Sequence, residues 1–178
     1  MMHISKRPVV SCICPSISMH LRLTCCMIVP WAAQSWLEPS CIFAPGNAKH
    51  LSFAVKHIAS LGSQFAMRGG GHMPITSSHS INSTGVLISS TNLDTLALSA
   101  DKKTLSIGSG RRWSDAFEFL EGTGRSVVGA RSTHVGVPGM LLGGGISFYS
   151  YEYGLGSTNG NVQAYEVLCI RWICLRKD

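Results

Sequence analysis

The sequence predicts an α+β fold for the middle of the chain, and three observations support this. Apolar residues recur there with helical spacing in some segments and alternate as in strands in others. Glycine, serine and aspartate turns separate these segments. Eighteen of the 19 glycines lie between Gly62 and Gly160, partly in clusters beside predicted strands. The 178 residues and the 45% apolar content suit one domain with a buried core.

The first predicted element is a helix between Asn47 and Gly62. Asn47 is a residue type that caps helix N-termini, and Gly62 is a type that ends helices. Leu51, Val55 and Ile58 fall at i, i+4 and i+7 between them. We therefore expect a helix with one apolar face, which leads directly into the next strand.

Four strands are predicted next. Residues 64–67 are typical of a short buried strand, and residues 85–89 form another after a loop rich in serine and threonine. Residues 96–99 and 104–107 alternate apolar with small or polar side chains and are joined across 101–103. This pattern predicts an antiparallel hairpin.

A second helix is predicted over residues 115–121, with Ser114 as its cap and a glycine just beyond its end. It would bury Phe117 and Leu120, and a short apolar strand at 126–129 follows it. The aromatic side chains expected in the core are Trp113, Phe117 and Tyr165.

Two glycine clusters are the main candidates for a ligand site. Arg68-Gly69-Gly70-Gly71-His72 follows a predicted strand, and consecutive glycines can aim their amide groups at one phosphate. His72 adds a nucleophilic imidazole. The second cluster, residues 136–145, suggests with the first a large ligand. The alternatives are a flexible turn for Gly69 to Gly71, a capping or core role for His72, and close packing at a helix end for Gly143 to Gly145.

Charge and composition disfavour several other functions. The net charge is +6, but residues 43–168 carry nine Lys and Arg against seven Asp and Glu, so nucleic acid is not an expected partner. The cysteine pairs at Cys12 and Cys14 and at Cys25 and Cys26 are too close for a zinc site, so no metal is predicted. The uncharged run 23–37 is shorter than the ~20 residues that cross a bilayer, so no membrane partner is expected either.

The sequence also bears on secretion and on the common nucleotide-binding motifs. Secretion is possible, because a weak signal-peptide pattern precedes Ala33 and Asn82-Ser83-Thr84 is a glycosylation sequon. The common nucleotide fingerprints fail, because Trp113 stands where the third glycine of a Rossmann loop would follow Gly108-Ser109-Gly110. No P-loop pattern is present.

Four separated motifs resemble the FAD-binding PCMH-type domain of berberine-bridge-enzyme-like, FAD-linked oxidoreductases, fungal ones in particular. They are residues 65–72, 96–115, 128–147 and 165–167, in the order and spacing of that family. The resemblance runs from about Trp31 to Leu168. It implies two α+β subdomains that clasp FAD, with the histidine of the R-x-G-G-H loop, here His72, joined covalently to the flavin.

The resemblance also implies a function. Such enzymes oxidise a C–H bond of a small-molecule substrate by hydride transfer to flavin N5, and dioxygen reoxidises the flavin. No catalytic residue is assigned. For Arg68, the pyrophosphate and a surface carboxylate stay open as partners, and His134 is expected to position the backbone rather than act as a base. The residues expected to contact FAD are Arg68, Gly69, Gly70, Gly71, His72, Ser132, Thr133, His134, Gly136, Val137, Gly139, Gly143, Gly144, Asn161 and Val162.

The sequence departs from the family in three places. Ser132 stands where some relatives attach the flavin a second time through cysteine, which excludes a second thioether. The segment 155–162 is slightly longer than in the family. Residues 1–30 and the tail 169–178 do not fit the pattern, so we expect a domain over 31–168 without a C-terminal substrate domain, ends of low order, and both ends derived from a misread intron or a frameshift.

Three functional classes therefore remain: a flavin-dependent oxidoreductase, a flavin-binding module without catalysis, and a non-functional fragment. The substrate, the electron acceptor, the oligomeric state and the cellular location are not predicted.

Overall fold

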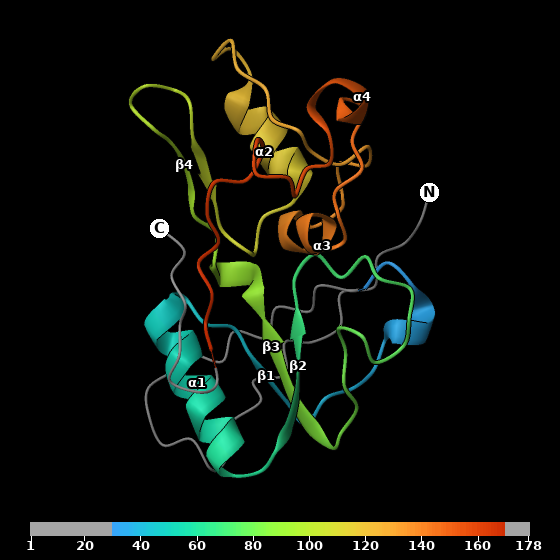
Figure 1. Ribbon diagram of the computed structural model, residues 1–178. Helices are drawn as coiled ribbons and strands as arrows, with labels where there is room; N and C mark the ends of the chain where they lie inside the picture. Colours follow the sequence, from blue (N-terminus) through green and yellow to red (C-terminus); the bar gives the residue numbers. More distant parts are fainter. Residues whose placement is uncertain (1–29, 170–178) are drawn as a thin grey trace.

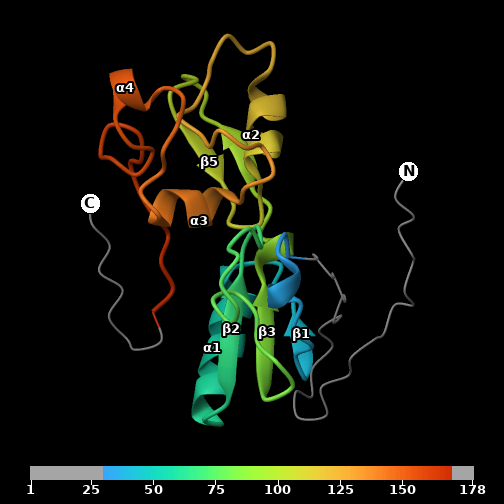
Figure 2. The same cartoon turned by 90° about the vertical axis from the view of Figure 1, so that its right-hand side faces the viewer.

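The computed structural model describes residues 30–169, and these form two lobes stacked end to end (Figure 1, Figure 2). The first lobe contains the short 3-10 helix η1, Ala33–Ser35, then β1, Cys41–Phe43, α1, Ala48–Ser60, β2, Gln64–Arg68, and β3, Gly85–Ser89. A second 3-10 turn, η2, Ser90–Asn92, leads out of it. The expected end segments 1–30 and 169–178 lie outside the described residues, apart from Pro30 and Cys169.

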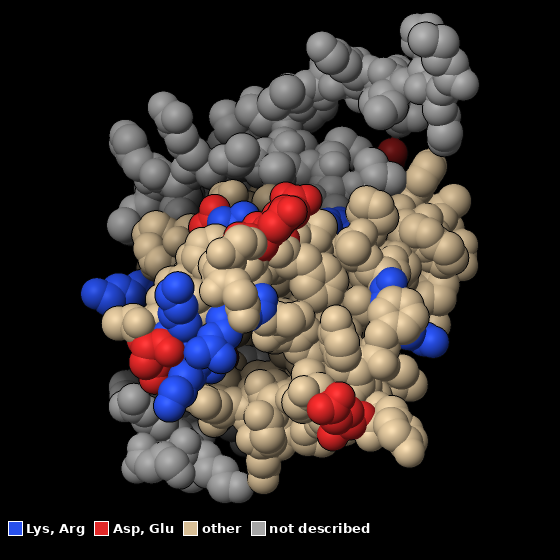
Figure 3. Space-filling view, turned by 90° about the horizontal axis from the view of Figure 1, so that it is seen from above, with Lys and Arg blue, Asp and Glu red and all other residues tan. Residues whose placement is uncertain are grey.

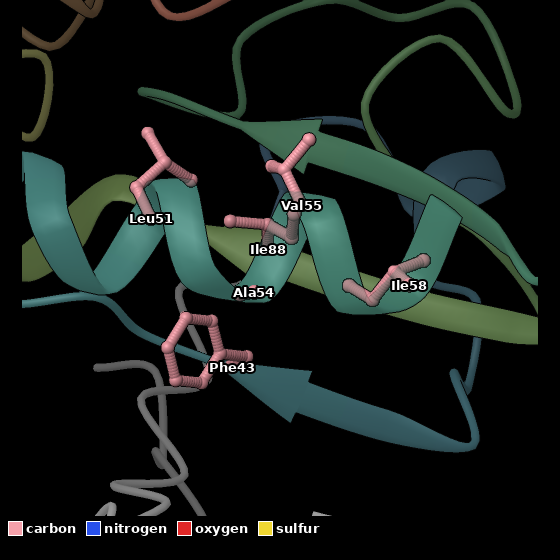
Figure 4. Close-up of a cluster of buried hydrophobic side chains, with 6 residues drawn as sticks. All are labelled: Phe43, Leu51, Ala54, Val55, Ile58 and Ile88. Carbon is pink, nitrogen blue, oxygen red and sulfur yellow. The ribbon is translucent and has the colours of Figure 1, made fainter. Parts of the chain in front are cut away.

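The first lobe is built on a parallel sheet with the strand order β1-β3-β2. β3 pairs on both sides, with Cys41 opposite Val86 and Phe65 opposite the same residue. α1 covers one face of the sheet, and its apolar side chains meet Ile88 of β3 and Phe43 of β1 (Figure 4). The buried members of this cluster are Phe43, Leu51, Ala54, Val55, Ile58 and Ile88.

The helix prediction is confirmed in detail, because the Asn47 side chain accepts a hydrogen bond from the His50 amide at 2.9 Å. The strand predicted at 64–67 is confirmed as β2, but its predicted burial is wrong. β2 is the edge strand of the sheet, so Met67 is 42% exposed and only Arg68 is buried. β1 was not predicted, because three residues are too few for a periodic signal.

The second lobe consists of the hairpin β4, Leu96–Leu98, and β5, Leu105–Ile107, followed by three helices. These are α2, Trp113–Leu120, α3, Val137–Leu142, and α4, Ser150–Tyr153. Its buried cluster comprises Trp113, Ala116, Ala130 and Val137. The hairpin prediction is confirmed, with Leu96 opposite Ile107.

Several predictions for this lobe need correction. α2 begins at Trp113 rather than Asp115, because the Asp115 carboxylate accepts the Arg112 amide at 2.9 Å and so caps the helix itself; Ser114 lies inside the first turn. Residues 126–129 form no strand. The sheet of this lobe consists of β4 and β5, which pair with each other, and residues 126–129 pair with neither.

The second glycine cluster is also not a loop throughout. Residues 137–142 form α3, which Pro138 can begin because proline is tolerated in the first helical turn. Of the aromatic residues expected in the core, Trp113 is buried, Phe117 is half-buried, and Tyr165 is exposed. Tyr165 lies on the segment that returns from the second lobe toward α1, where Leu168 packs against the first cluster (Figure 1).

Charged side chains are dispersed on the second lobe. On the face seen from above, basic side chains lie beside acidic ones and most of the surface is uncharged (Figure 3). Among residues 30–169, no helix is long and apolar enough to cross a membrane. The same residues contain no cluster of three or more His, Cys, Asp or Glu suited to a metal ion.

Candidate functional site

The first glycine segment lies at the carboxyl end of the parallel sheet, directly after β2. Gly71 has a φ of +67°, a conformation that side-chain-bearing residues rarely adopt, and its carbonyl accepts the Trp31 amide at 2.9 Å. Within the described residues, the amides of Gly70, Gly71 and His72 donate no hydrogen bond. This segment therefore presents backbone donors that a ligand can use.

The two glycine clusters touch each other at the junction of the lobes. A Cβ at Gly70 would lie 2.4 Å from the Gly136 nitrogen, and a Cβ at Gly136 would lie 2.5 Å from the Gly70 nitrogen. Gly69 in turn would meet the Pro138 side chain at 3.2 Å. Only glycine at both positions lets the backbones approach this closely. The sequence showed two glycine-rich segments, and the structure brings them together at one place.

Two further glycines, which belong to the motif at residues 96–115, also lie at this junction. A Cβ at Gly108 would lie 2.1 Å from the Leu93 carbonyl oxygen, and one at Gly110 would lie 2.3 Å from the Ser90 carbonyl oxygen. The Ser90 hydroxyl also donates to the Ser109 carbonyl at 2.8 Å. These contacts fix the path of the chain as it leaves β5 and returns to the first lobe.

His72 is half-buried and stacks on Trp31, with ring centroids 5.3 Å apart and planes inclined by 14°. Trp31 itself is 67% exposed, so its ring covers the imidazole from the solvent side. The Trp36 indole donates to the Pro30 carbonyl at 2.7 Å and so closes the turn that carries Trp31. The sequence does not indicate this stack, because Trp31 and His72 are far apart in the chain and no local pattern connects them.

Arg68 lies beneath the glycine segment rather than on the surface. Its side chain is buried, donates from Nε to the His79 carbonyl at 3.3 Å, and comes within 3.6 Å of the Cβ position of Gly71. Burial lowers the pKa of the Arg68 guanidinium from its ordinary value. The guanidinium therefore connects the two ends of the loop 69–79.

The second side of the junction begins with the exposed loop Ser132, Thr133 and His134. The Thr133 carbonyl accepts the Ser114 amide at 2.9 Å, and the His134 carbonyl accepts a hydrogen bond from the Arg112 guanidinium. The backbone of this loop is thus held on α2, and its side chains stay accessible. The role expected of His134, to position the backbone, stays a prediction.

α3 continues this side of the junction. Val137 is buried in the second cluster, whereas Gly139 is exposed and a Cβ there would meet no described atom within 4 Å. Packing within the lobe therefore does not require glycine at 139. Gly143 ends α3 and is also exposed, and Gly144 follows with a φ of +99°.

Asn161 and Val162 lie on the segment 155–162, here called the strap. Its amides at Gly156 and Ser157 donate to the glycine turn that follows α3. The Asn161 side-chain amide donates to the carbonyls of Tyr153 and Leu155, each at 2.9 Å. The Gly156 amide donates to the Gly145 carbonyl at 2.7 Å, which fastens the strap to the glycine turn. Val162 is half-buried and its amide donates to Thr158 at 2.9 Å. The Asn161 side chain therefore shapes the strap itself.

These features together fit a large ligand that carries a phosphate. The amides of the first glycine segment are available for anionic oxygens. Gly139 is exposed on α3 with no atom near its Cβ position, and the half-buried His72 supplies a nucleophilic ring nitrogen. Ligand sites often form where two lobes meet, so this junction is the candidate site for such a ligand.

The chain belongs to the FAD binding domain family, whose sequence pattern matches residues 39–170. It is 39% identical over 125 residues to the FAD-dependent monooxygenase yanF of Aspergillus niger, covering 70% of this chain and 22% of that protein. The chain thus spans about a quarter of the length of the relatives it matches. The predicted family and its α+β PCMH-type fold are confirmed.

Two solved structures show the same fold. Berberine bridge enzyme, solved as a histidine-to-alanine variant in complex with (S)-reticuline, superimposes with a TM-score of 0.63 at 24% identity, over 68% of this chain and 25% of that one. Glucooligosaccharide oxidase from Acremonium strictum gives 0.63 at 22% identity, over 71% of this chain and 26% of that one. The second protein carries a 6-S-cysteinyl, 8α-N1-histidyl FAD.

Proposed function

We propose that the junction of the two lobes is the FAD site and that His72 attaches the flavin covalently. The observation that carries this proposal is the contact between Gly70 and Gly136, with unused amides and a half-buried imidazole beside it. Gly69, Gly70 and Gly71 would hold the pyrophosphate through their backbone. The histidyl FAD of glucooligosaccharide oxidase supports the attachment, since that protein shares the fold.

The second side of the junction would enclose the rest of the cofactor. We assign the flavin end to Ser132, Thr133 and His134, whose side chains are accessible. Serine has no thiol, so attachment through His72 alone is proposed, unlike the double attachment in glucooligosaccharide oxidase. The other assigned contacts are Gly136, Val137, Gly139, Gly143, Gly144, Asn161 and Val162.

Besides their assigned place in the site, Arg68 and Asn161 stabilise its backbone. Arg68 holds the loop 69–79 from below, and Asn161 holds the strap over the end of α3. Both hold the backbone in place before the cofactor binds, so less conformational entropy is lost on binding. Within this scheme His72 is the one protein group that forms a bond to the flavin.

We further propose that the protein serves in oxidation of a small-molecule substrate, as its family resemblance implies. Bound flavin supplies the hydride acceptor for such a reaction. This chain supplies the amides that orient the cofactor and the imidazole that retains it. Because the chain spans about a quarter of its relatives, the substrate and the activity of the complete protein remain proposals.

Acid precipitation tests the attachment directly. The chain is expressed or refolded with FAD, precipitated in acid, and the flavin absorbance of the pellet is compared among wild type, His72→Ala and His134→Ala. We expect flavin in the pellets of wild type and His134→Ala and none in that of His72→Ala. Equal pellet absorbance in all three proteins would show that the flavin is attached elsewhere, and colour only in the supernatants would show that it is not attached.

A further inference from the structure

The turn Asn82-Ser83-Thr84 lies at the opposite end of the first lobe from the FAD site. It precedes Gly85, the first residue of β3, whereas the glycine segment 69–72 follows the last residue of the neighbouring parallel strand β2 (Figure 1). All three residues of the turn are exposed. It is also the single Asn-x-Ser/Thr triplet in the sequence. A group attached here would point away from the cofactor.

The side chain of Asn82 is held by hydrogen bonds to its oxygen, and its amide nitrogen makes none among the described residues. Its Oδ1 accepts hydrogen bonds from the Thr84 amide at 3.0 Å and from the Thr84 hydroxyl at 2.6 Å. The Asn82 carbonyl accepts the Gly85 amide at 3.2 Å, which closes the turn. Among the described residues, Asn82 Nδ2 has no hydrogen-bond partner, so the fold does not need this nitrogen.

The surface beside the turn has room for a sugar. An open surface hollow of about 480 Å³ is lined by polar side chains together with Phe65, Ala66 and Ile81. A pyranose ring has hydroxyl groups at its edge and C–H groups on its faces, so a lining of mixed polarity suits it. The polar side chains are those of Ser63, Gln64, Ser77, Ser80, Asn82 and Thr84.

We propose that Asn82 is an N-glycosylation site when the chain passes through the secretory pathway. The donor is an oligosaccharyl diphosphate lipid. The Asn82 amide nitrogen forms a bond to C1 of the first sugar and loses a proton, while the bond from C1 to the phosphate oxygen breaks and the lipid diphosphate leaves. The Thr84 hydroxyl, which pairs with the Asn82 amide group, is the second residue that the reaction requires.

The structure supplies closely matched variants for the test. Asn82→Asp keeps an acceptor oxygen at the position of Oδ1, and therefore the turn, but removes the nitrogen that receives the sugar. Thr84→Val keeps the shape of the side chain and removes the hydroxyl. Ser83→Ala changes the middle position, which the sequon leaves variable. A positive control, Asp101→Asn combined with Lys103→Thr, adds a second sequon at the exposed tip of the hairpin.

The full 178-residue chain is secreted from yeast behind a cleavable signal, treated with peptide N-glycosidase, and mapped by mass spectrometry. We expect one glycan on wild type and Ser83→Ala, none on Asn82→Asp and Thr84→Val, and two on the double variant. Enzymatic release should convert Asn82 to aspartate. A double variant with its only glycan at position 101 would overturn the proposal, because that chain has met the glycosylation machinery and Asn82 has not reacted. The outcome is independent of whether FAD binds.

Discussion

The two lobes meet at one site but are stabilised in different ways. The first has a three-stranded parallel sheet, and Ile88 at its centre is fully buried. The second has a two-stranded hairpin and a smaller cluster, and it leaves Leu142 80% and Phe148 77% exposed around α3 and α4. We infer that the first lobe supplies most of the stability. The second lobe is held to it through the glycine contacts that form the site.

The largest effect should come from the core of the first lobe. Ile88→Ala removes buried methyl groups from the centre of the sheet and should lower the free energy of unfolding by about 2–5 kcal/mol. Urea denaturation measures the change. Ile75→Ala is the matched control, because Ile75 is 64% exposed, and it should change little. Similar losses in both variants would contradict the proposed distribution of stability.

The junction comes next. Gly70→Ala places a Cβ 2.4 Å from the Gly136 nitrogen, so the lobes must move apart. We expect a loss of about 1–3 kcal/mol and a loss of flavin retention. Gly46→Ala is the control, since its Cβ would meet nothing closer than 3.8 Å. Retained flavin and unchanged melting in Gly70→Ala would show that the close backbone contact is not needed.

Acid should weaken the loop beneath the glycine segment. Burial, and then the Arg68 charge, lower the pKa of His79 below its ordinary value of 6.5 in the folded protein. As the pH falls below about 6.5, His79 of the unfolded chain takes up a proton before His79 of the folded protein does. The contribution of His79 to the free energy of unfolding is therefore present above that pH and decreases as the pH falls to the lower pKa of the folded protein. Urea midpoints across pH ~5 to ~8 should decline toward acid in the wild type and less steeply in His79→Gln. If the urea midpoints of the two proteins changed with pH in parallel, His79 would not be the cause of the decline.

The Trp31 stack should have the smallest effect. Losing an aromatic pair of about 0.5–1.5 kcal/mol should slow flavin attachment about 2- to 12-fold in Trp31→Ala. Trp31→Phe keeps an aromatic face and should lose less. The measurement is the time course of acid-stable flavin after FAD is added. An unchanged rate in Trp31→Ala would mean that the stack does not position His72.

The sequence predicted the elements whose stabilising contacts are local. The α1 helix follows from the Asn47 cap and the spacing of Leu51, Val55 and Ile58, and the hairpin follows from its alternation. Errors arose where distant contacts decide. β2 is at an edge because β3 pairs between it and β1, and residues 126–129 are irregular because Gly129 packs on Trp113, where a Cβ would lie 2.4 Å from the indole.

The same distinction holds for the site. Glycine composition and the family motifs indicated both segments of the junction. The contact between Gly70 and Gly136 depends on how the lobes meet, whereas the stack of Trp31 on His72 and the buried position of Arg68 depend on contacts between separated segments of the first lobe. No pattern within a single segment carries that information.

Peptide mapping of the FAD-loaded chain tests the central claim most directly. Trypsin should cut after Arg68 and Lys102, so the peptide 69–102 contains His72 and His79, and His134 lies in a separate peptide that starts at Ser132. We predict that the flavin mass stays on peptide 69–102 and that fragmentation places it on His72. Flavin mass on the peptide that carries His134, on His79, or on no peptide would contradict the account.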